Sequence, residues 1–80
     1  MADYPEFVAE IDTSGLVCPL PLLRTKKALQ TIESGQILKV LTTDKSAVAD
    51  FQAFAKQTGN TILLQQAIEE GKVLHFIQKR

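Results

Sequence analysis

Four glycines divide this chain of 80 residues into short segments and limit the folds that it can adopt. They stand beside polar residues that favour turns, as Ser14 does before Gly15 and Asn60 after Gly59. The segments between these turns carry two hydrophobic patterns, one with the period of a strand and one with the period of a helix. We therefore expect a single small domain over residues 1–80.

Six elements are predicted from these patterns. The expected strands cover residues 6–12, 36–42, 61–67 and 72–78, and the expected helices run from Pro19 or Pro21 to about Glu33 and from about Ser46 to Thr58. The first two strands and the helix between them form a βαβ unit with parallel strands, and the last two form an antiparallel hairpin. The βαβαββ order predicts an α/β (α+β) two-layer sandwich, with a mixed four-stranded sheet and both helices on one face.

The only cysteine, Cys18, lies at the predicted junction between the first strand and the first helix. Pro19 and Pro21 are compatible with a first helical turn, whose N–H groups have no partner inside the helix. The N-terminus of a helix carries a partial positive charge, which favours a thiolate over a thiol. We therefore expect a reactive Cys18 with a lowered pKa. The alternative is an inert cysteine that acts as a small hydrophobic side chain.

The other residues of the sequence limit the reactions in which this thiol can take part. A single cysteine excludes an intramolecular CxxC redox cycle, and one cysteine with one histidine does not make a zinc site. His75 lies within the apolar run VLHFI, so we expect it in the core or on a sheet face rather than as a catalytic base. A lone reactive cysteine is suited to carrying a group, as a persulfide or as a mixed disulfide with a partner.

The composition balances nine basic against nine acidic residues, which gives a formal net charge of zero. This balance argues against non-specific nucleic-acid binding, which depends on neutralising phosphates. No apolar run approaches the roughly 20 residues that a membrane helix needs, and the first residues lack the pattern of a signal peptide. A lone cysteine is typical of a reducing setting. We expect a cytoplasmic protein with no membrane partner and no direct nucleic-acid partner.

The motif D-x-x-G-L-x-C-P-x-P is formed by Asp12, Gly15, Leu16, Cys18, Pro19 and Pro21. Together with the βαβαββ order, it resembles the TusA/SirA/YedF family of small sulfur-carrier proteins. The resemblance implies that Cys18 accepts sulfane sulfur as a persulfide, while the other motif residues support it structurally. It implies a persulfide relay of the sulfurtransferase type rather than a stand-alone turnover enzyme, with no metal or organic cofactor.

The resemblance also implies the partners. Donors in the family are cysteine desulfurases or rhodanese-type sulfurtransferases, and acceptors include DsrE-type relay proteins. Members that thiolate tRNA often carry two acidic residues after the second strand and a further cysteine in the second helix, where this chain reads TTDKS and FQAFA. The pathway, tRNA thiolation or sulfur oxidation, is therefore left open.

A partner surface is predicted from the spacing of charged residues. Arg24 and Lys27 share one flank of the first helix. Asp44 and Lys45 follow the second strand and should lie near Cys18, because parallel strands end at the same edge of a sheet. The alternatives are that these charges form an ordinary solvated surface and that the chain is a non-catalytic regulatory or interaction module with an inert Cys18. A third interpretation is a redox sensor that dimerises through Cys18; otherwise we expect a monomer.

Overall fold

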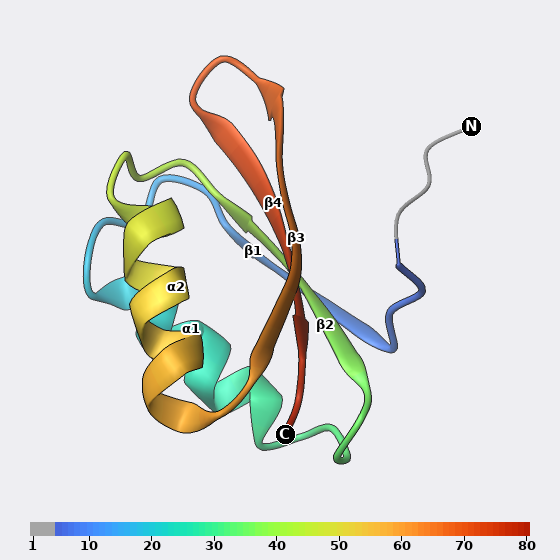
Figure 1. The fold of residues 1–80 in the computed structure, drawn as a ribbon. Coiled ribbons are helices and arrows are strands. Elements are labelled where there is room, and N and C mark those ends of the chain that lie inside the picture. Colours follow the sequence, from blue (N-terminus) through green and yellow to red (C-terminus); the bar gives the residue numbers. More distant parts are fainter. Residues whose placement is uncertain (1–4) are drawn as a thin grey trace.

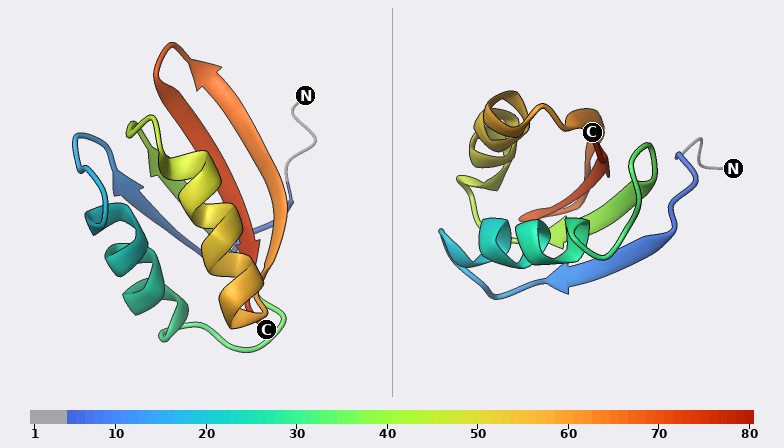
Figure 2. Two further views of the ribbon diagram at one scale, coloured as in Figure 1. Left: turned by 60° about the vertical axis from the view of Figure 1, so that its left-hand side comes forward. Right: turned by 90° about the horizontal axis from the view of Figure 1, so that it is seen from below.

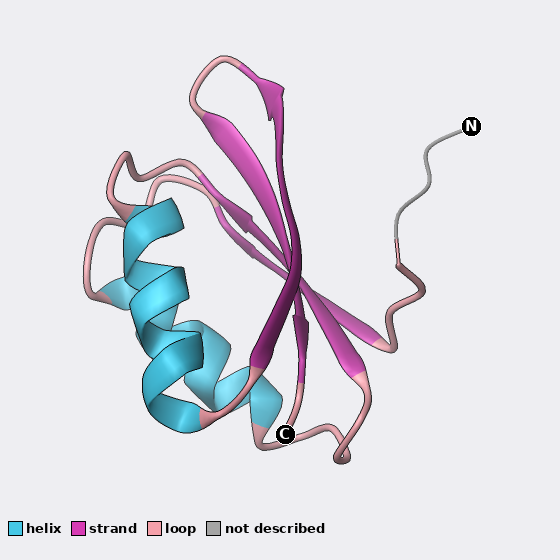
Figure 3. Cartoon of the chain, in the orientation of Figure 1, coloured by secondary structure: helices cyan, strands magenta, loops and turns pink. Residues whose placement is uncertain are grey.

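The computed structural model describes residues 5–80 and has the predicted order of elements. The strands are β1 (Ala9–Thr13), β2 (Ile37–Thr42), β3 (Thr61–Glu69) and β4 (Lys72–Gln78), and the helices are α1 (Leu20–Leu29) and α2 (Ala47–Thr58). Both helices lie on one face of the sheet (Figure 1), and Figure 3 shows the same two layers coloured by secondary structure. The predicted two-layer sandwich is confirmed.

The strands form one mixed sheet in the order β1-β2-β4-β3. Strands β1 and β2 are parallel, with Thr13 opposite Thr42 at their carboxyl ends. Strand β4 is antiparallel to both β2 and β3. Figure 2 shows β3 and β4 as a hairpin on the side of the sheet away from β1. This topology places the two connections that follow β1 and β2 at the same edge of the sheet.

The observed ends of three elements differ from the predicted ones by two residues or more. Strand β1 begins at Ala9 rather than at residue 6, although the N–H of Val8 already bonds to Ile37 O at 2.9 Å. Helix α1 ends at Leu29, because the chain then tightens into turns with i→i−3 hydrogen bonds such as Thr31 N to Ala28 O at 3.0 Å. Strand β3 continues to Glu69, two residues beyond the predicted end.

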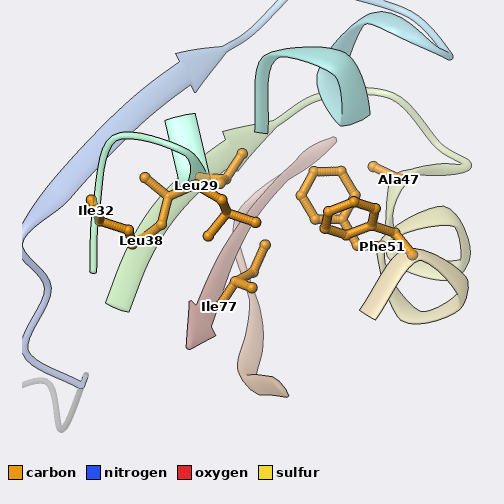
Figure 4. Close-up of a cluster of buried hydrophobic side chains, with 8 residues drawn as sticks. Leu29, Ile32, Leu38, Ala47, Phe51 and Ile77 are labelled. Atoms are coloured by element: carbon orange, nitrogen blue, oxygen red, sulfur yellow. The ribbon is translucent and has the colours of Figure 1, made fainter. Parts of the chain in front are cut away.

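The main hydrophobic core fills the space between the helices and the sheet (Figure 4). It contains buried side chains from both helices, from the turn after α1 and from β2 and β4: Leu29, Ile32, Leu38, Val40, Ala47, Phe51, Phe54 and Ile77. In the sequence, apolar stripes at helical spacing are formed by Leu22, Leu29 and Ile32 and by Val48, Phe51 and Ala55. Of these, Leu29, Ile32 and Phe51 lie in this core, and Leu22 packs against it. Phe51 and Leu38 are completely buried at its centre. Packing against this core fixes the positions of the helix N-termini, where the site lies.

A smaller apolar cluster lies on the other face of the sheet. Phe76 of β4 is buried there, with the ring of Phe7 at 6.2 Å between centroids and the Lys39 ammonium 5.0 Å from the centroid of Phe7. The N-terminal segment thus covers part of the face that the helices leave open. Among residues 5–80, neither helix has the length and hydropathy that a membrane span requires.

Candidate functional site

Two connections, β1 to α1 and β2 to α2, are held together by side chains at the carboxyl ends of the parallel strands. The Thr43 hydroxyl oxygen accepts the N–H of Gly15 at 2.8 Å, and Oδ2 of Asp44 accepts the N–H of Cys18 at 2.8 Å. The predicted proximity of Asp44 to Cys18 is thereby observed. Each bond joins residues that lie more than 20 positions apart, so the segment that carries Cys18 is anchored to the second βα connection.

The turn that begins at Asp12 shapes the start of this segment. Asp12 Oδ1 accepts the N–H of Ser14 at 2.8 Å, and the N–H of Leu16 bonds to Thr13 O at 3.1 Å. The Ser14 side chain and then the Ser14 backbone lower the pKa of the Asp12 carboxyl by hydrogen bonding. Gly15 has φ +80°, a left-handed conformation that glycine adopts without steric cost. The D-x-x-G part of the motif therefore redirects the chain from β1 toward Cys18.

Cys18 lies two residues before the first residue of α1, and its side chain is exposed. Pro19, joined to Cys18 by a cis peptide bond, is the N-cap, and α1 begins at Leu20, so Pro21 is inside the first turn. Pro21 is buried and holds this turn against the rest of the molecule. The predicted position of Cys18 beside the helix N-terminus is confirmed.

The pKa of the Cys18 thiol is raised, so the predicted lowering is wrong. The largest cause is the hydrogen bond between the thiol and the Asp50 carboxylate, followed by desolvation and by the negative charges of Asp50 and Asp44. A carboxylate beside the sulfur disfavours the thiolate, because two like charges would then lie close together. The expectation considered only the N-terminus of α1 and omitted the carboxylates that α2 and its preceding connection bring to the sulfur.

Asp44 is held in its charged form by the backbone around it. Its carboxylate accepts N–H groups of Cys18 and Ser46, and these bonds lower its pKa. The Ser46 hydroxyl lies between the two carboxylates, 3.0 Å from Asp44 Oδ2 and 3.1 Å from Asp50 Oδ2. It does not cap α2, although its position is that of the N-cap. The Cys18 thiol thus lies beside two neighbouring carboxylates, those of Asp44 and Asp50.

An apolar groove of about 370 Å³ runs between α1 and α2 from the side of Cys18. Its lining includes Pro19, Leu22, Leu23 and Phe54. Leu23 is 53% exposed, and Val17, one residue before Cys18, is 64% exposed. The exposed sulfur is therefore bordered by carboxylates on one side and by exposed apolar side chains on the other.

The structure divides the predicted partner surface into two parts. Arg24 and Lys27 border a separate groove of about 360 Å³ on the β1 side of α1, together with Asp12. Asp44 belongs to the hollow that holds Cys18. Lys45 is exposed on the connection before α2. Of the four predicted docking residues, only Asp44 contacts the cysteine segment directly.

His75 is completely buried in the middle of β4, as the sequence predicts. Its ring stacks on Phe51 at 4.3 Å between centroids, and Nε2 lies 2.8 Å from the Thr42 hydroxyl. Burial lowers its pKa to about 4. Over residues 5–80, no three His, Cys, Asp or Glu side chains are grouped so that they could hold a metal ion.

Asp50 is the site residue that the sequence analysis missed. It lies in the first turn of α2, and the sequence analysis treated that turn only as the start of the second helix. A signal was available: both helices start at the same edge of the sheet, so an acidic residue in the first turn of α2 is a neighbour of the cysteine before α1. The same argument correctly placed Asp44.

The chain is similar to known proteins over nearly all of its length. The family model described as Sulfurtransferase TusA matches residues 9–79. The sulfur carrier protein TusA of Allochromatium vinosum is 51% identical over 80 residues, which cover 100% of this chain and 99% of that protein. The putative sulfur carrier protein YrkI of Bacillus subtilis is 50% identical over 70 residues, with coverages of 86% and 91%.

A solved structure agrees with this assignment. The crystal structure of a SirA-like protein from Desulfitobacterium hafniense matches with a TM-score of 0.78 and 29% sequence identity, covering 89% of this chain and 96% of that one. The family match therefore extends from the sequence to the arrangement of the sheet and helices. By sequence and by fold, the chain belongs to the TusA family of sulfurtransferases.

Proposed function

We propose that this chain, a sulfur carrier by family, accepts sulfane sulfur on Cys18 as a persulfide and relays it to a partner protein. The observation that supports this most directly is the position of its single thiol. Cys18 is exposed on a short segment that hydrogen bonds to the neighbouring connection hold in place, so an approaching protein can reach the sulfur. Persulfide formation is one of the reversible modifications open to such a cysteine.

The transfer takes place in two steps. In loading, the Cys18 sulfur attacks the outer sulfur of a donor persulfide, the donor S–S bond breaks, and the electron pair leaves with the donor thiolate. In unloading, a partner thiolate attacks the outer sulfur, and the Cys18 sulfur leaves in the same way. A cysteine desulfurase or a rhodanese is the proposed donor, and a DsrE-type relay protein is the proposed acceptor.

The test is to incubate the reduced protein with a cysteine desulfurase plus cysteine and, separately, with thiosulfate plus a rhodanese. Intact mass spectrometry should show the gain of one sulfur atom, which a thiol reductant removes. The Cys18→Ser variant, which keeps the size of the side chain, should gain nothing. If neither donor adds sulfur to a protein whose thiol is shown to be reduced and accessible, the proposal fails and an interaction module with an inert Cys18 is favoured.

The partner surface is part of the same proposal. Arg24 and Lys27 are proposed to attract an acidic partner segment, while Asp44 and Lys45 lie on the connection beside the sulfur. Charge reversal at Arg24 and Lys27 should weaken donor or acceptor binding and alter its dependence on salt. A matched control is charge reversal at Lys56, in the last turn of α2. If both variants bind the partner with equal affinity, Arg24 and Lys27 do not belong to the partner surface.

A further inference from the structure

The hollow that holds Cys18 has an acidic wall. Asp44 and Asp50 line it, together with Pro19 and Phe51 among other residues. Asp44 is fixed by the N–H groups of Cys18 and Ser46, so it is not free to swing toward the sulfur. Asp50 has no such backbone bond among those found in residues 5–80, and its carboxylate lines the same hollow as Cys18, where its negative charge opposes ionisation of the thiol.

The charged groups around this thiol come from both helices and from the connection between β2 and α2. Asp50 is contributed by α2 and Asp44 by the connection, and both oppose the thiolate. From α1, Lys26 lines the same interhelical groove as Asp50, so Asp50 borders both this groove and the hollow that holds Cys18. The carboxylate that restrains the thiol is thus itself open to a positive charge from the side where a partner would dock.

We propose that Asp50 is a specificity-determining residue, which makes Cys18 slow to react with small molecules and leaves sulfur transfer to partners that engage this carboxylate. The inference rests on the proposed sulfur-carrier function. In the unloaded protein, the negative charge of Asp50 in the same hollow favours the protonated sulfur. In the loaded protein, the charge of Asp50 opposes the departure of Cys18 as a thiolate. A docked cationic group that pairs with Asp50 removes both restraints.

Asp50 affects both steps of sulfur transfer, the loading of Cys18 and its unloading. During loading, the thiol proton passes to a base, the Cys18 sulfur bonds to the outer sulfur of the donor, and the donor thiolate leaves with the electron pair. The rate depends on the fraction of thiolate, which the carboxylate holds down. During unloading, the electron pair of the inner S–S bond goes to Cys18, which then takes a proton. A thiol of higher pKa leaves more slowly. Neither step needs an added oxidant or reductant.

The test compares Asp50→Asn with the unchanged protein. The amide has the shape of the carboxylate and lacks its charge. The first readout is the rate of alkylation of Cys18 by iodoacetamide across pH. The profile of Asp50→Asn should move to lower pH, and the rate at pH 7 should rise by about threefold for each unit of the shift, because the larger thiolate fraction is partly offset by a less nucleophilic sulfur. The second readout is the loss of sulfur from the persulfide form to glutathione, followed by intact mass, which should be faster in the variant.

A carboxylate distant from the sulfur provides the matched control. Glu33 lies beyond the far end of α1, so Glu33→Gln removes one negative charge and should leave both readouts unchanged. Circular dichroism verifies that each variant is folded. Asp50→Ala carries the same expectations and replaces Asp50→Asn if the amide variant does not fold, because Asp50 is only partly buried.

The outcomes separate this inference from the proposed function. If Asp50→Asn and the unchanged protein give the same pH profile, the inference is overturned while sulfur loading is unaffected. A shifted profile with an unchanged rate of sulfur loss also overturns it, because the leaving-group role then fails. If no variant accepts sulfur from either donor, the proposed function fails, and the alkylation profile still reports the effect of Asp50 on the thiol.

Discussion

At the scale of single residues, the site depends on side chains that bond to the backbone of another segment. Asp44 is the clearest case, because one carboxylate accepts N–H groups from Cys18 and from Ser46. Charge-assisted bonds of this kind are stronger than bonds between neutral groups. They fix the direction of the segment between Gly15 and Pro19, which has neither helix nor strand geometry to hold it.

Replacing Asp44 with alanine should release this segment. The Cys18 amide then loses its acceptor, and we expect its hydrogen exchange to accelerate by about tenfold or more, as for amides that open locally. Nuclear magnetic resonance measures this rate directly. The control is Asp12→Ala, which removes the acceptor of Ser14 and leaves the Cys18 bond in place. Equal Cys18 exchange in both variants would show that Asp44 does not hold the segment.

At the scale of the elements, α2 ends in a left-handed residue that only glycine accommodates easily. Gly59 has φ +81°, and its N–H bonds to Ala55 O at 2.9 Å. A Cβ built at Gly59 would lie 2.8 Å from Cδ of Arg80. Gly35 has a similar φ of +86° but open space around its Cα. A comparison of alanine substitutions at these two glycines therefore separates the cost of backbone strain from the cost of a side-chain contact.

Gly59→Ala and Gly35→Ala should each lower the free energy of unfolding by about 1–2 kcal/mol, the usual cost of a left-handed alanine. Gly59→Ala should cost a few tenths of a kcal/mol more, because Arg80 must move. Urea denaturation measures both values. In an Arg80→Ala background the two costs should become equal, and a persistent difference would mean that the Arg80 contact is not its origin.

Helix α1 contains a buried hydroxyl without a partner. Thr25 is completely buried, and its Oγ1 forms no hydrogen bond with any of residues 5–80. Valine has nearly the same shape and no polar atom to desolvate. Thr25→Val should therefore raise the free energy of unfolding by about 1 kcal/mol. Thr31→Val is the control, because the Thr31 hydroxyl is exposed and bonds to Ala28 O. A destabilised Thr25→Val protein would indicate that the hydroxyl is satisfied in solution.

At the scale of the whole molecule, His75 links the sheet to α2. Its Nε2 lies 2.8 Å from Thr42 Oγ1, and its Nδ1 lies 3.1 Å from Gln65 Nε2. Gln65 Nε2 also donates to Val48 O at 3.1 Å. A neutral ring with its proton on Nε2 fits these partners, because the Gln65 amide then donates to Nδ1. The core of the folded protein thus contains an imidazole ring, that of His75, which must stay neutral.

This network predicts a loss of stability on mild acidification. The unfolded chain protonates His75 near its ordinary pKa of 6.5, whereas the folded chain resists protonation until about 4. Stability is therefore full above pH 6.5 and falls between these values, by roughly 2–3 kcal/mol in total. Asp12 and Asp44, whose pKa values are lowered below 3.8, stabilise the fold throughout this range and lose that contribution only at lower pH.

Denaturation with urea at several pH values measures this loss, and titration of the His75 ring by nuclear magnetic resonance measures its pKa independently. His75→Gln removes the titrating group and should flatten the profile between pH 6.5 and 4. A ring that titrates near 6.5 in the folded protein, or an unchanged slope in the variant, would contradict the assignment.

The order of the elements and their layers could be predicted from the sequence, because turn residues and hydrophobic periods act locally. Thr13-Ser14-Gly15 and Gly59-Asn60 mark real chain reversals for that reason. The end of α1 was predicted at Glu33 because Ile32 continues the apolar stripe. In the structure Ile32 is buried from a turn after the helix. Periodicity alone does not distinguish these two backbone conformations.

The position of Cys18 could also be predicted, but its protonation could not. Proline chemistry acts on adjacent residues, so it places the thiol beside the start of α1 from sequence alone. The pKa depends on Asp50, which lies 32 positions away and approaches only through the packing of α2. A property that depends on residues far apart in the sequence, such as this pKa, can be predicted only from the folded structure.

The pairing of β2 with β4 has a practical consequence for handling this protein. Ile37 lies opposite Gln78, and Lys79 N bonds to Gln36 O at 2.8 Å, so Arg80 is at the amino end of β2, whereas Cys18 follows the carboxyl end of β1 at the opposite end of the sheet. An affinity tag, a fluorophore or a surface linker joined after Arg80 would extend away from the thiol. The protein can then be immobilised through Arg80 while the Cys18 sulfur remains accessible to a partner protein in solution.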